Sequence, residues 1–149
     1  MANEEAVAFG FLLIGLGIAL VFYLVVVGFV CWLLSGWLAK IPPEHRKVEP
    51  GKVWLLMIPL FQLVWNFFVF PPMAESFDAC FRSKNEPAES ALGLAKVFCW
   101  VNVGAFVGGL IPCLSIFLGP LGGLATLVLL ILVLVKFHAL KEKVVAGTK

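Results

Sequence analysis

Three carboxamide side chains lie inside apolar stretches that contain no charged residue: Gln62, Asn66 and Asn102. A polar group in an apolar environment needs a hydrogen-bond partner, because leaving it unpaired there is costly. Gln62 and Asn66 are four residues apart and therefore share one face of a helix. They could form the neutral polar lining of a pore or a ligand pocket. We favour the alternative, hydrogen bonding between helices with Asn102 as a partner, which contributes about 0.6 kcal/mol per side chain.

Other side chains that could perform catalysis or bind a cofactor are isolated. The two histidines, His45 and His138, are predicted at helix ends and not at one depth inside a bundle, so they do not indicate a haem. The four cysteines form no C-x-x-C pair, which argues against a zinc site. Ser35, Ser76 and Ser115 lack sequence neighbours that could supply both the base and the positioned third group that a serine nucleophile needs. We therefore expect a protein that is not an enzyme and binds no metal or other cofactor.

The distribution of charged residues along the chain indicates what kind of segment contains the three amides. Residues 6–39, 53–74 and 97–135 contain no Asp, Glu, Lys or Arg. A charged side chain at the centre of a membrane helix costs roughly 2.5–3.5 kcal/mol, whereas a soluble domain has no reason to exclude charge from stretches this long. The formal net charge of +2 is too small to indicate nucleic-acid binding. The sequence thus predicts an integral membrane protein.

Helix lengths follow from the need for about twenty apolar residues per crossing. We expect one domain over residues 1–149, with membrane helices at about 4–39, 50–70, 87–118 and 120–143 and a short interfacial helix at about 72–83. The last two membrane helices are divided at the glycine-rich stretch 119–123. Proline removes a backbone hydrogen bond, so Pro59 should kink the second helix, and Pro71 and Pro72 should break or bend it again.

The predicted interfacial helix is amphipathic. Its apolar residues recur every four positions, at Met73, Phe77 and Phe81. Its charged residues occupy the opposite face, at Glu75, Asp78 and Arg82. This pattern is typical of a helix that lies in the plane of the membrane surface.

The predicted third membrane helix carries a face of small residues around Asn102. The members of this face are Ala95, Cys99, Gly104, Ala105, Gly108 and Gly109. Small residues allow two helix backbones to approach closely, and the G-x-x-x-G spacing of Gly104 and Gly108 is one form of this pattern. We favour packing against another helix of the same chain, with self-association as the alternative.

Two topologies distribute the eleven basic residues differently. Basic residues favour the cytoplasmic side of a membrane. Four crossings with both ends in the cytoplasm leave the basic residues of the 40–52 loop outside. If the second helix dips in and returns to the same side, with the N-terminus outside, all of them become cytoplasmic. We prefer four crossings because residues 53–74 are long enough to span a bilayer.

Residues 41–68 read IPPEHRKVEPGKVWLLMIPLFQLVWNFF. This segment resembles a group of small bacterial membrane proteins whose second helix carries a similar W-L-L-x-I-P-x-F-x-L-V-W-N-F-F stretch. The resemblance implies a bacterial membrane protein with a proline-bent second helix, and we expect the inner membrane as its location. No activity is attached to that group, so the resemblance implies no catalytic or binding residue.

These observations predict an all-α integral membrane bundle of four crossing helices, the second kinked or re-entrant, plus an interfacial helix. The expected function is that of a non-enzymatic structural or accessory subunit that assembles with itself or with a larger membrane complex. Its expected partners are the lipid bilayer and other membrane subunits, not nucleic acid. The alternative is a small oligomeric channel or transporter lined by the second helix.

Overall fold

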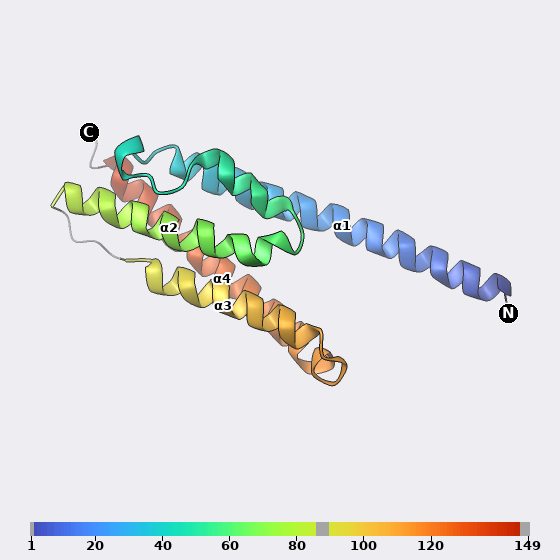
Figure 1. Ribbon diagram of the computed structural model, residues 1–149. Helices are drawn as coiled ribbons and strands as arrows, with labels where there is room; N and C mark the ends of the chain where they lie inside the picture. The colour runs from blue at the N-terminus through green and yellow to red at the C-terminus, as the bar shows by residue number, and fades with distance from the viewer. Residues whose placement is uncertain (1, 86–89, 147–149) are drawn as a thin grey trace.

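The computed structural model describes residues 2–85 and 90–146, with side chains described at 4–85, 90–111 and 120–146. All regular structure in these residues is helical, which confirms the all-α class (Figure 1). In chain order the elements are the helix α1 (Ala2–Leu38), the short 3-10 helices η1 (Pro43–His45) and η2 (Pro50–Met57), and the helices α2 (Phe61–Ser83), α3 (Leu92–Gly109) and α4 (Pro112–Ala146).

Three of these helices contain segments that are long and apolar enough to cross a membrane: Glu4–Leu38, Leu92–Gly109 and Pro120–Ala146. The 18 residues of α3 extend about 27 Å at 1.5 Å per residue, close to the thickness of a bilayer core. The 37 residues of α1 extend about 55 Å, so this helix is longer than the core is thick. Two of the three charge-free stretches, 6–39 and 97–135, therefore correspond to helices that could cross a membrane, whereas 53–74 does not form such a helix.

The predicted helix over 50–70 is wrong, because the chain reverses direction within it. η2 ends at Met57, and α2 starts at Phe61 and runs back beside it (Figure 1). Ile58 is extended (φ −80°, ψ 112°), the conformation that a following proline favours. Leu60 has φ 66°, in the left-handed region that few non-glycine residues adopt. Pro59 thus sits in a tight reversal and does not kink a continuous helix.

The predicted interfacial helix over 72–83 is the second half of α2, which continues through Pro71 and Pro72. Its apolar face is directed into the protein interior, with Met73, Phe77 and Phe81 all buried. Two prolines remove two intrahelical hydrogen bonds. We attribute the survival of the helix to this buried face, which a surface helix would not have.

The last two helices divide at a different place from the one predicted. The chain turns at Leu110 and Ile111, and α4 begins with Pro112, a residue that the first helical turn tolerates. The stretch 119–123 lies inside α4, so the predicted helices 87–118 and 120–143 are both wrong at this boundary. Residues 87–89 of the first fall outside the described part of the chain.

Gly122 shows why part of that stretch belongs inside a helix. A Cβ atom at this position would lie 2.8 Å from the Cβ atom of Ala105 on α3. Real Cβ contacts are not this short, so glycine permits α4 to approach α3 at this point. The absence of a side chain at Gly122 therefore serves helix packing and not a turn.

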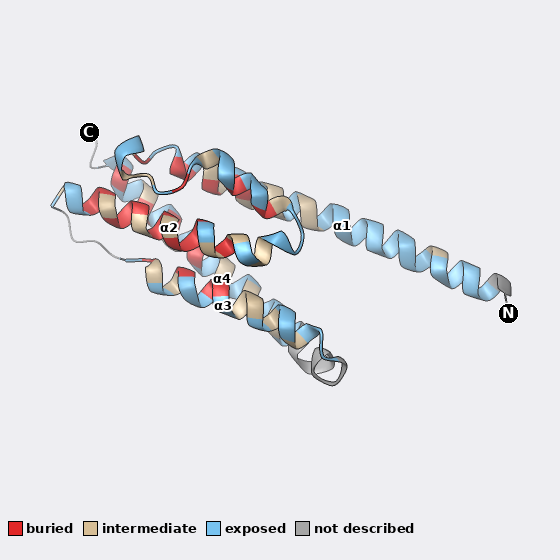
Figure 2. Ribbon diagram, viewed as in Figure 1, coloured by how far each residue is buried: buried red, intermediate tan, exposed pale blue. Residues whose placement is uncertain are grey.

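Buried side chains are concentrated at one end of the bundle (Figure 2). Aromatic rings from three helices meet there: the Phe70 and Phe98 ring centroids lie 4.8 Å apart, and Phe137 lies 5.7 Å from Phe77. The first half of α1, in contrast, extends past the other helices with its apolar residues exposed (Figure 2).

The same end gathers the polar loops and helix termini (Figure 1). The ring of Trp37 near the end of α1 lies tilted against that of His138 on α4, with ring centroids 5.9 Å apart. Lys84, just after α2, donates to the carbonyl oxygen of Val144 at 3.3 Å. The N-terminus of α1 and the turn between α3 and α4 lie toward the opposite end (Figure 1).

Candidate functional site

A group of uncharged polar side chains lies between the helices near the reversal at Leu60. The hydroxyl of Tyr23 on α1 donates to Oε1 of Gln62, in the first turn of α2. The same hydroxyl lies 3.5 Å from the carbonyl oxygen of Leu56 on η2. One phenol thus links α1 to both arms of the η2–α2 hairpin.

Asn66 lies one turn further along α2 and is 1% exposed. Its Nδ2 donates to Oδ1 of Asn102 on α3 at 3.4 Å, a long hydrogen bond. The expected contact between Asn102 and an amide of the second helix is therefore confirmed. Gln62 and Asn66 share one side of α2 but reach different helices, because Gln62 bonds to α1 and Asn66 to α3.

A cavity of about 510 Å³ opens beside these side chains. Its polar lining residues are Tyr23, Gln62, Asn102 and Thr126. Its apolar lining residues are Pro59, Leu60, Leu63, Ala105, Phe106, Gly123, Leu127 and Leu130. None of these described residues carries a charge, so the cavity can offer hydrogen bonds and apolar contact but no counter-ion.

A smaller chamber of about 80 Å³ adjoins it and shares Gln62, Asn102 and Thr126 in its lining. Asn66 also lines this inner chamber. Two polar atoms around it, Oδ1 of Asn66 and Oγ1 of Thr126, are buried and have no hydrogen-bond partner among the described residues. Most buried polar atoms in proteins do have a partner, so these two oxygens indicate where a further polar group fits.

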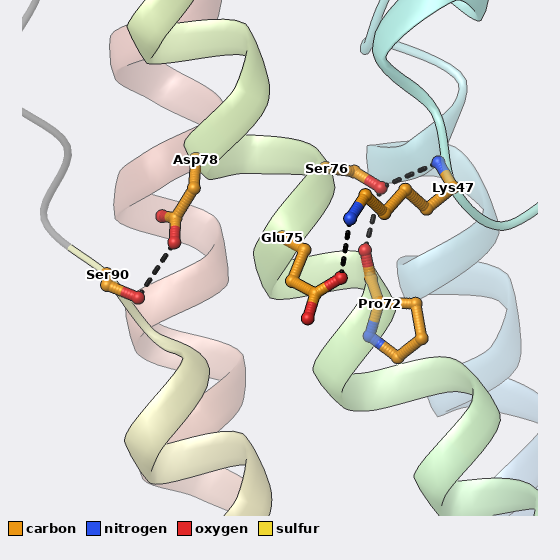
Figure 3. A network of polar contacts seen from close by, with 6 residues as sticks. All are labelled: Lys47, Pro72, Glu75, Ser76, Asp78 and Ser90. Atoms are coloured by element: carbon orange, nitrogen blue, oxygen red, sulfur yellow. Dashed lines mark hydrogen bonds and ion pairs between the residues drawn. The ribbon is translucent and has the colours of Figure 1, made fainter.

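A second polar network holds the hairpin to its neighbours at the charged end (Figure 3). The Ser76 hydroxyl accepts from the backbone N–H of Lys47 at 2.9 Å and donates to the carbonyl oxygen of Pro72 at 2.8 Å. Lys47 also pairs with Glu75 at 2.7 Å. Asp78 accepts from the hydroxyl of Ser90 at 2.8 Å, which connects α2 to the start of α3. These contacts fix the position of the loop before η2.

The small face of α3 is only partly used within the chain. Ala95 and Cys99 are fully buried, and Ala105 meets Gly122. Gly104 and Gly109 have no atom within 4 Å of a Cβ position, so the G-x-x-x-G pair of Gly104 and Gly108 does not form a close helix contact at its first residue. The physical reason is the rotation of α3, which presents Asn102 and Ala105 to the bundle and Gly104 to the outside.

Few of the described side chains near the cavity could bind a metal or take part in cofactor chemistry. No cluster of three or more His, Cys, Asp or Glu side chains capable of holding a metal occurs in the described part of the chain. Cys31, Cys80 and Cys99 are all buried. The arrangement can bind a neutral molecule by hydrogen bonds, and the cavity itself offers no carboxylate or imidazole for proton transfer.

Two of the uncharged polar side chains around the cavity, Tyr23 and Thr126, were not predicted from the sequence. Tyr23 is the only tyrosine of the chain and stands in the middle of an apolar stretch. A phenol in that setting needs a hydrogen-bond partner, and this was the signal that could have identified it. Thr126 has a similar setting, although a hydroxyl in a helix can also bond to its own backbone and is therefore a weaker signal.

No protein-family model, curated protein or solved structure matches this chain. The resemblance of residues 41–68 to small bacterial membrane proteins accordingly stays a prediction.

Proposed function

We propose that the chain crosses the bacterial inner membrane three times, through α1, α3 and α4, and that η2 and α2 form a re-entrant hairpin. The lysines and arginines of the described residues belong to the 40–52 loop, the end of α2, the first turns of α3 and the last third of α4. These segments gather at one end of the bundle, whereas Glu4 and Glu5 lie at the other (Figure 1). The positive-inside rule then places the N-terminus outside and the basic end in the cytoplasm.

Cysteine labelling tests this topology. In a variant whose native cysteines are replaced, Glu44→Cys and Asn85→Cys should both react with an impermeant thiol reagent only after the inner membrane is permeabilised. Glu4→Cys should react in spheroplasts with an intact membrane, because the N-terminus is outside. Labelling of Glu44→Cys and Asn85→Cys from opposite sides would show that α2 crosses the membrane and would contradict the re-entrant hairpin.

Within this topology we propose a non-enzymatic subunit that assembles through α1 with a second copy or with another membrane protein. The observation that carries the proposal is the lack of intrachain packing along the first half of α1, where apolar side chains such as Phe11, Ile14 and Ile18 are exposed. Gly17 lies in a shallow apolar groove with Ile14, Ile18, Val21, Phe22 and Val25. A glycine in such a groove permits the close approach of a second helix.

The channel or transporter alternative has less support. The amides expected to line a pathway, Gln62 and Asn66, are bonded to Tyr23 and Asn102. Hydrogen bonds of this kind usually hold neighbouring helices together. The cavity beside them belongs to one chain and is lined mainly by apolar side chains, which suits a lipid-soluble ligand better than an ion.

The assembly proposal predicts different effects for two glycines of α1. Gly17→Leu fills the groove and should reduce the particle in mild detergent to a single chain without co-purifying subunits. Gly15→Leu is the matched control, because it lies on the opposite face of the helix and also meets no atom within 4 Å. The measurement is mass by light scattering together with subunit composition by mass spectrometry. The proposal would be overturned if the unsubstituted protein were itself a single chain without other subunits in the same detergent.

A further inference from the structure

We infer that the cavity at the hairpin reversal binds a neutral membrane lipid through a hydroxyl group on its head. The volume of the cavity, about 510 Å³, falls within the roughly 300–1,000 Å³ of small-molecule sites. The site is separate from the groove at Gly17, since the two have no lining residue in common. The proposal of lipid binding and the proposal of assembly through α1 can therefore be tested independently of each other.

The exposed side chains at the rim of the cavity are apolar, so a ligand can reach the cavity from the hydrocarbon of the membrane. Leu60 is 68% exposed, Leu127 55% and Phe106 39%. In a membrane these side chains contact lipid tails, so an apolar molecule can enter without passing through water. A phosphate or ammonium head would lose its hydration and find no counter-ion, because no lining residue is charged. The ligand is therefore uncharged.

The inner chamber determines the polar group that this ligand must carry. The amide nitrogen of Asn66 is already bonded to Asn102, which leaves its Oδ1 as a free acceptor. The hydroxyl of Thr126 is also buried without a partner and can donate or accept. A group that both donates and accepts satisfies the two together. A hydroxyl does so, whereas an ester or a ketone can only accept.

The volume of the inner chamber bears on the size of the polar group that the ligand can place there. About 80 Å³ is more than the roughly 10–15 Å³ that one water requires in the same measure. It has room for a hydroxymethyl group, and its lining contains no charged residue that could pair with a phosphoester head. The lipid tail then occupies the outer cavity between α2, α3 and α4. A diacylglycerol has this combination of a single free hydroxyl and apolar chains.

Competition photolabelling of the full-length protein tests the site. The protein is reconstituted in phosphatidylcholine nanodiscs and labelled with a diacylglycerol that carries a diazirine in one acyl chain. Unlabelled dioleoylglycerol should displace this probe. The same lipid with its hydroxyl acetylated should compete about tenfold less well, because it can no longer donate a hydrogen bond to Asn66.

Substitutions at Thr126 supply the matched controls. Thr126→Val keeps the shape of the side chain and should weaken dioleoylglycerol binding about tenfold, whereas Thr126→Ser should retain it. Without lipid, Thr126→Val should unfold at the same temperature as the parent or higher, because a partnerless buried hydroxyl has been removed. A hydroxyl with a purely structural role would lower that temperature when removed.

Three results would overturn the inference. The first is the absence of saturable labelling, which is expected if the chamber holds only water. The second is equal competition by dioleoylglycerol and its acetylated form, which would reduce the site to an unselective apolar cavity. The third is unchanged lipid affinity in a folded Thr126→Val variant, since the proposed hydroxyl contact would then contribute nothing.

Discussion

Phe137→Ala should destabilise the protein by about 3–5 kcal/mol, the largest effect that we expect from a single substitution. The Phe137 side chain is fully buried. Its ring lies against Phe77 and Phe70 of α2, at centroid distances of 5.7 and 6.5 Å. Truncation leaves a cavity where α4 meets α2, and surrounding side chains in a close-packed interior relax only partly into such a space.

The matched control is Phe68→Ala, which removes a ring of the same size from the outer side of α2. Phe68 is 57% exposed, and its ring contacts Trp65 within the same helix. Its loss should change the free energy of unfolding by no more than about 0.5 kcal/mol. Unfolding in mixed micelles, followed by circular dichroism, measures both variants. Equal losses would mean that the contact between α4 and α2 does not stabilise the bundle.

Gly122→Ala should cost about 1–3 kcal/mol, although alanine is the better helix former by about 1 kcal/mol. The new Cβ atom would lie 2.8 Å from Cβ and 3.3 Å from Cα of Ala105. Neither atom is the end of a flexible side chain, so α3 and α4 must separate to relieve the contact. We expect the loss to appear as a lower unfolding midpoint in the same assay.

Two further variants isolate this contact from helix propensity. Gly123→Ala adds the same methyl group one residue later, where no atom lies within 4 Å, and should be neutral or slightly stabilising. Ala105→Gly combined with Gly122→Ala removes the opposing methyl group and should recover most of the lost stability. A double variant that is as unstable as the sum of its single variants would show that the two residues are not coupled.

The apolar surroundings of the helices and the all-helical fold could be predicted from the sequence, because both depend on local composition. Charge is excluded from hydrocarbon at every position, so the charge-free stretches 6–39 and 97–135 indicate the apolar helices α1, α3 and α4, although 53–74 is equally free of charge and forms no such helix. The predicted first helix, about 4–39, ends within one residue of Leu38. The amides at Gln62, Asn66 and Asn102 could be singled out for the same reason, since each needs a partner wherever the chain places it.

Chain direction could not be predicted in this way. Pro59 is compatible with a kinked helix or with a reversal, and the choice depends on whether α2 finds a surface on α3 and α4 when it turns back. Pro71 and Pro72 disfavour a helix locally, yet α2 continues because its apolar face is buried. A contact with a distant segment contributes nothing to local propensity, so these outcomes appear only in the tertiary structure.

The same distinction explains the polar site. The sequence by itself determined that Gln62, Asn66 and Asn102 are expensive in an apolar setting. Only the tertiary structure decided that Tyr23 bonds to Gln62, that Asn66 bonds to Asn102, and that Asn66 and Thr126 each leave an oxygen unpaired. The need for a hydrogen bond is a property of one side chain, whereas its satisfaction depends on which helices pack together and at what rotation.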